Sequence, residues 1–202
     1  MNIKELLDSG NFAEVIMQTS NSTNADELQW RAFAFQKSGE FETAMDVWNQ
    51  LILRLPEAAS FYNERGVCKF NLRFKHSLDD FDKAISLEPE NPYYWACRAY
   101  VRDKLGKTEE AVADYQKAHD LDPEDATILN NLGLAEQKLG YTSRARERFK
   151  KSNDLIGFKE EELEPEAETT LEKTGWKARW AEVGKMLSSR KEFKKFLKEL
   201  FE

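Results

Sequence analysis

The sequence predicts an all-α protein made of stacked helix pairs, and three observations carry this prediction. A pattern of small, aromatic and turn-forming residues returns every 34 residues and is clearest between Pro92 and Asp125. Within each copy, apolar residues recur at spacings of three and four, the period of an α-helix. Each copy is too short to bury its apolar face alone, so neighbouring copies must stack on one another. Together these features indicate an α-solenoid.

Small and aromatic residues occupy fixed places in each copy. Small residues let the two helices of a pair approach closely, and an aromatic residue near the twenty-fourth place fills the space between successive copies. The small residues are Ala32, Gly66, Ala99 and Gly133 in the first helices, and Ala44, Ser77, Ala111 and Ala145 in the second. The aromatic residues are Trp48, Phe81, Tyr115 and Phe149.

Turn-forming residues mark where the helices end. Gly39, Gly106 and Gly140 suit the left-handed conformation that closes a helix. The second copy is one residue shorter and offers Leu72-Arg73-Phe74 in place of that glycine. Prolines end the second helix of the first three copies, at Pro56, Pro89 and Pro123, and Gly157 takes this place in the fourth.

The N-terminal residues 1–24 contain a weaker version of the same pattern. Apolar residues lead to Gly10 and resume at Phe12, which predicts a degenerate half-repeat that caps the array. Asn24 and Glu27 have the spacing of a capping box for the helix that follows.

The motif Asn131-Leu132-Gly133, followed by Lys138-Leu139-Gly140-Tyr141, resembles the tetratricopeptide repeat family. The resemblance spans residues 25–158 and implies four repeats in a right-handed superhelix, at 25–58, 59–91, 92–125 and 126–158. It further implies a non-enzymatic scaffold or adaptor, which binds a peptide or a helix of another protein in a concave groove lined by the first helix of each repeat.

The resemblance also places the residues of that groove. Apolar members would receive partner side chains, and amides would bond a peptide backbone. The alternative is that the apolar residues at the ninth place of each repeat simply pack between adjacent first helices. These residues are Phe33, Val67, Tyr100 and Leu134. The expected partner-binding residues are Gln29, Phe33, Asn63, Val67, Phe70, Tyr93, Tyr100, Lys104, Asn130 and Leu134.

Composition narrows the classes of function. The net charge of −7 argues against binding a phosphate backbone, and no apolar run approaches the ~20 residues of a membrane span. The first residues lack a secretory core, so we expect a cytoplasmic protein. Cys68 and Cys97 are then expected to be reduced, small buried residues, with a disulfide or a metal pair as the alternative.

The sequence offers no recognisable active site. It contains no phosphate-binding loop, paired-cysteine motif or nucleophile elbow. His76 and His119 are interpreted as structural or solvent-facing, and the pair Asp79-Asp80 as part of a solvated helix face. We therefore expect no enzymatic activity, no cofactor and no catalytic metal.

The C-terminal residues differ in character from the repeats. Residues 159–170 form an acidic linker, and residues 171–202 carry a net charge of +4 against −11 for the rest of the chain. Apolar stripes predict two amphipathic helices, near 172–187 and 190–201. Three hypotheses follow for this segment: it covers the last repeat, it occupies the groove or engages a partner, including a second copy of the chain, or it lies on a membrane surface.

Overall fold

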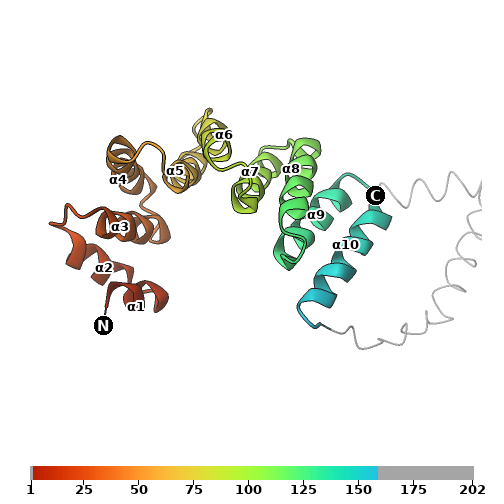
Figure 1. Ribbon diagram of the computed structural model, residues 1–202, viewed down its shortest axis with the longest axis horizontal. Helices are drawn as coiled ribbons and strands as arrows, with labels where there is room; N and C mark the ends of the chain where they lie inside the picture. The colour runs from red at the N-terminus through yellow and green to blue at the C-terminus, as the bar shows by residue number, and fades with distance from the viewer. Residues whose placement is uncertain (1, 159–202) are drawn as a thin grey trace, which may run out of the picture. The chain divides into compact units, whose positions relative to one another are not determined.

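A computed structural model describes residues 2–158, which form ten α-helices in successive hairpins (Figure 1). The first five helices are α1 (Ile3–Asp8), α2 (Phe12–Thr19), α3 (Ala25–Lys37), α4 (Phe41–Arg54) and α5 (Ala59–Asn71). The next five are α6 (Ser77–Leu87), α7 (Pro92–Lys104), α8 (Thr108–Leu121), α9 (Ala126–Lys138) and α10 (Thr142–Leu155). No helix in this range is long and apolar enough to cross a bilayer. The predicted all-α solenoid is confirmed.

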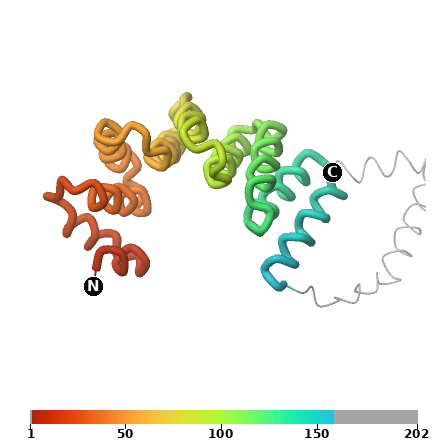
Figure 2. The backbone as a smooth tube through the Cα atoms, viewed as in Figure 1, coloured from red at the N-terminus to blue at the C-terminus, as the bar shows by residue number. Residues whose placement is uncertain are grey.

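Each helix packs against its neighbours along the chain, as expected of a solenoid. The tube in Figure 2 passes from one hairpin to the next, and no coloured segment returns to an earlier hairpin. The first helices of consecutive hairpins also meet: α5 contacts α7, and α7 contacts α9, more closely than the second helices α4, α6 and α8 contact one another. The closer spacing of the first helices makes theirs the inner face of the array.

Short polar side chains begin several of the helices. Asn2 and Glu5 form a complete capping box at α1, and the Asn91 and Asp125 side chains cap α7 and α9. The box predicted at α3 is only half formed. The Asn24 side chain accepts the Asp26 and Glu27 backbone N–H groups, but the N–H of Asn24 donates to Ser22 Oγ at 3.0 Å.

The hairpin turns use the left-handed conformation that the glycines predicted. Gly39, Gly106 and Gly140 have φ angles of 83°, 81° and 83°. In the shorter repeat the same place is taken by Arg73, with φ 60°, the one non-glycine residue of positive φ in the described chain. The turn geometry is therefore kept in all four repeats, although the residue that favours it is not.

The core is divided into clusters, each of which joins neighbouring hairpins. Leu6, Val15 and Ala34 form the N-terminal cluster, and a larger one surrounds Trp48. Two further clusters join α5 to α7 and α7 to α9. The predicted aromatic places behave as expected, since Trp48 and Phe81 are fully buried, and a Cβ added to Gly66 would lie 2.9 Å from the Phe81 ring.

Arginines on the first helices join the two helices of a hairpin through buried ion pairs and reach back to the preceding hairpin through further polar contacts. Arg98 of α7 grips Asp114 of α8 with two hydrogen bonds of 2.7 and 2.9 Å, and reaches back to Asp82 of α6 at 2.7 Å. One repeat earlier, Arg65 makes the same two-bonded contact with Asp80 and reaches Asn49 of α4.

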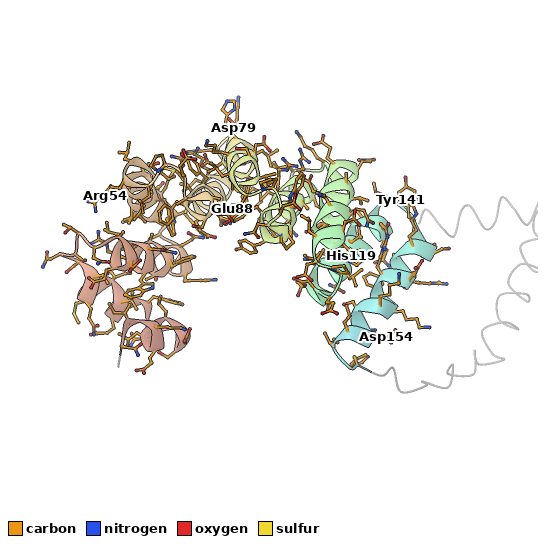
Figure 3. All side chains as sticks on the ribbon, in the orientation of Figure 1. Arg54, Asp79, Glu88, His119, Tyr141 and Asp154 are labelled. Atoms are coloured by element: carbon orange, nitrogen blue, oxygen red, sulfur yellow. The ribbon has the colours of Figure 1, made fainter. Side chains whose placement is uncertain are left out.

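This arrangement corrects the interpretation of Asp79-Asp80 as a solvated pair. Asp79 lies exposed at the outer edge of α6 (Figure 3), but Asp80 is buried and bound by Arg65 and by Lys69. The two carboxylates are adjacent in sequence, so they lie about 100° apart around the helix and meet different surroundings. The acidic linker and the two C-terminal helices predicted after Phe158 lie outside the described residues.

Candidate functional site

A groove of about 610 Å³ opens between the first helices α5, α7 and α9. It crosses them obliquely. The C-terminal part of α5 contributes Val67, Phe70 and Asn71, and the N-terminal part of α9 contributes Thr127, Ile128 and Asn131. Most of the intervening lining comes from α7 and from the loop before α9: Pro92, Tyr93, Ala96, Cys97, Tyr100, Val101, Asp122 and Asp125.

The floor of the groove is apolar and uncharged. Tyr93 and Tyr100 expose 54% and 49% of their surfaces, a large aromatic area for a folded chain to leave to water. Burial raises the pKa of the Cys97 thiol to about 11, and the pKa of the Tyr93 phenol is raised by burial and then by the adjacent Cys97. Both groups therefore stay protonated at neutral pH, so a partner here would meet aromatic and aliphatic surface.

The structure brings together five of the residues that were expected to bind a partner. Val67, Phe70, Tyr93 and Tyr100 line the groove itself. Lys104 lines an adjoining hollow with Phe70, and its ammonium lies 5.2 Å from the centre of the Tyr100 ring. These five residues come from α5 and α7, so the middle of the array is where the predicted surface forms.

The predicted residues nearer the N-terminus are engaged elsewhere. Phe33 packs edge-on against Trp48 of α4, the second helix of its own hairpin, with ring centres 5.2 Å apart. Gln29 is half-buried and does not line the groove.

Asn63 is fully buried and donates to Glu64 Oε1 at 3.0 Å, which corrects the expectation that its amide is open to a peptide. Glu64 Oε2 in turn accepts from Gln36, whose own oxygen accepts the Trp48 indole N–H. The burial of this polar network is possible because each carboxylate oxygen has a donor. The Asn63 side chain is thus part of the core and not of the groove surface.

On α9, Asn130 and Leu134 are exposed but lie outside the lining of the groove. The prediction assumed that the same positions of every repeat face the partner. The groove instead runs obliquely, so it meets α9 nearer the start of that helix. The prediction therefore missed Asp122, Asp125, Thr127 and Asn131. The structure brings the start of α9 beside the start of α7 in the lining, with Thr127 and Ile128 near Pro92 and Tyr93, and no pattern in the sequence indicates this.

The adjoining hollow also measures about 610 Å³ and has a different character. It lies where α5 and α7 end, and Phe70 and Asn71 line both hollows, which makes them continuous. Its charged residues are all cationic: Arg73, Lys75 and Lys104.

Within residues 2–158 the side chains able to ligate a metal do not gather into a site. No group of three or more His, Cys, Asp and Glu side chains could hold a metal ion there, and both cysteines are free. His76 is exposed beside Asp79. Burial and the nearby Arg148 lower the pKa of His119, which leaves it neutral at pH 7.

The fold and its inner groove define an α-solenoid of helical hairpins, a class that generally serves as a protein-interaction scaffold. Sequence models described as "TPR repeat" and "Tetratricopeptide repeat" match residues 101–140 and 81–113, respectively. Residues 81–140 thus contain tetratricopeptide repeats, as the resemblance implied. Scaffolds of this family are typically non-catalytic.

Solved structures share the fold at low sequence identity. MamA from Desulfovibrio magneticus RS-1 is 18% identical, with a TM-score of 0.65 over 78% of this chain and 93% of that chain. TTC0263, a thermophilic TPR protein of Thermus thermophilus, is 19% identical, with a TM-score of 0.65 over 76% of this chain and 87% of that chain. No curated protein matches the sequence.

Proposed function

We propose that this protein is a non-enzymatic adaptor that binds a peptide segment of another protein in the groove between α5, α7 and α9. The half-exposed pair Tyr93 and Tyr100 on the groove floor carries this proposal. Aromatic side chains dominate the energetics of protein interfaces when they become buried. An extended peptide across the groove would cover both rings.

The residues around the rings support binding with modest demands on sequence. Asn71, Thr127 and Asn131 line the groove and carry side chains that both donate and accept hydrogen bonds. Such groups can bond a peptide backbone, while Val67, Phe70 and Ile128 provide apolar contacts between them. The cytoplasm, as first expected, is the compartment we propose for this binding.

The test is selection of peptides from a random display library on the purified chain. We expect peptides to be enriched on the unmodified protein and on Leu53→Asp, but not on Tyr100→Asp. Leu53 is the matched control because it is 84% exposed on α4 and does not line the groove. Circular dichroism should show equal helical content in all three proteins.

Equal enrichment on the Tyr100→Asp variant, or no enrichment on any of the proteins, would remove the groove as the binding site. Membrane-surface binding through residues 171–202 rests on residues outside the described part of the chain. Self-assembly, the other function considered, would use the same tail or the face near Asn153 to Phe158, where Leu155, Ile156 and Phe158 expose 45%, 65% and 55% of their surfaces.

A further inference from the structure

The two connected hollows place opposite charges at the two ends of one apolar surface. Arg73, Lys75 and Lys104 lie where α5 and α7 end. Asp122 and Asp125 lie where α9 begins. Between the two sets are the rings and aliphatic side chains of the floor, and Phe70 belongs to both hollows.

None of these five charged groups forms an ion pair within residues 2–158. By contrast, Arg98 is paired with Asp114 and Asp82. The ammonium of Lys104 lies 5.2 Å from the centre of the Tyr100 ring, so its N–H donors are available to a partner. Both hydrogen bonds by which Asp125 caps α9 end on its Oδ1 atom, so Oδ2 takes no part in the cap.

From this distribution we propose that the groove selects a peptide segment with charges of opposite sign at its two ends. Acidic side chains of the partner face Arg73, Lys75 and Lys104, an aromatic or aliphatic centre covers Tyr93 and Tyr100, and a Lys or Arg faces Asp122 and Asp125. The proposal rests on the proposed function and adds the chemistry of the occupant to it.

The length of the segment follows from the helices that it crosses. α7 has 13 residues and is therefore about 20 Å long. An extended chain advances about 3.3 Å per residue, so roughly six residues reach from one charged end to the other. A segment with charges of one sign would leave one end without a counter-charge and would place like charges together at that end, which disfavours it.

The experiment is a display selection with randomised eight-residue segments flanked by uncharged linkers, so that every charge comes from a side chain. Five proteins are compared: the unmodified chain, Tyr100→Asp, Lys104→Glu, the control Lys150→Glu, and the double variant Asp122→Asn with Asp125→Asn. Asparagine keeps the oxygens that accept the Glu124, Thr127 and Ile128 N–H groups, so the loop and the cap of α9 are preserved. Lys150→Glu, an exposed residue of α10 outside both hollows, is the matched control for Lys104→Glu.

On the unmodified chain and on Lys150→Glu, we expect enriched peptides to carry acidic residues on one side of an apolar centre and basic residues on the other. Lys104→Glu should abolish the acidic preference alone, and the double asparagine variant the basic preference alone. A synthetic peptide from the first selection should bind about fivefold more weakly to Lys104→Glu and unchanged to Lys150→Glu.

Enriched peptides that depend on Tyr100 but show no charge preference would overturn this inference and leave the proposed function standing. Peptides with one sign of charge throughout would also overturn it. Failure to enrich any peptide that depends on Tyr100 would overturn the proposed function itself, so the two outcomes are distinguishable.

Discussion

Arg73 has the left-handed backbone conformation that glycine adopts at the same place in the other three repeats. Its φ of 60° is the counterpart of the 81° to 83° at Gly39, Gly106 and Gly140. For a residue with a Cβ, the left-handed conformation costs about 1–2 kcal/mol. A glycine there would remove this strain but would also lose about 0.5–1 kcal/mol through the greater freedom of the unfolded chain.

We therefore expect Arg73→Gly to raise the free energy of unfolding by about 0.5 kcal/mol. Urea denaturation followed by circular dichroism measures the change. Arg73→Ala is the control, because it removes the arginine side chain and keeps the strained Cβ; it should leave stability nearly unchanged. An equal gain from alanine would show that the side chain, and not the backbone, was responsible.

Single residues also show what could be foreseen from the sequence and what could not. The glycine turns and the buried aromatics Trp48 and Phe81 followed from spacing, because a period of 34 residues fixes which places face the core. Asn63 did not follow, because whether an amide faces a partner or a buried carboxylate depends on Glu64 and Gln36, which come from different helices. Side-chain partners across helices are a property of the packing and not of the period.

At the scale of helices, the arginine contacts explain how one hairpin is fixed on the next. Arg98 and Arg65 each hold an aspartate of their own hairpin and a polar oxygen of the preceding one. The period suggested that apolar stacking alone joins the repeats. The recurrence of Arg65 and Arg98 one repeat apart was visible in the sequence, but their partners sit on faces that the pattern assigned to solvent.

We expect Asp114→Ala to lower the free energy of unfolding by about 3 kcal/mol, because it leaves the largely buried guanidinium of Arg98 with only the exposed Asp82 as a counter-charge. Asp114 is 4% exposed on its side chain and receives both Arg98 and Arg102. Glu110→Ala is the matched control on the same helix. Glu110 lies 3.4 Å from Arg102 but is 51% exposed, so its loss should cost less than about 0.5 kcal/mol.

Urea denaturation of both variants measures this difference. Similar costs for Asp114→Ala and Glu110→Ala would show that the buried pair contributes no more than a surface pair, and that apolar packing alone fixes α7 on α8.

At the scale of the whole repeat array, stability is a chain of local contributions. Each core cluster joins only neighbouring hairpins, and helices far apart in sequence do not contact one another within residues 2–158. Stability in such an array is approximately a sum of hairpin terms and nearest-neighbour terms. The groove between α5, α7 and α9 lies in the middle, where hairpins are supported from both sides.

This organisation predicts that damage at one end stays local. Val15 is fully buried in the N-terminal cluster with Leu6 and Ala34, so Val15→Ala should cost about 2 kcal/mol there. Amide hydrogen exchange should speed up in α1, α2 and α3 and remain unchanged in α7, α8 and α9. Leu132→Ala, in the cluster that joins α7 to α9, should produce the reverse pattern and should also weaken peptide binding. If either substitution accelerated exchange equally in all ten helices, the array would unfold as one cooperative unit, and the groove would depend on both ends of the solenoid.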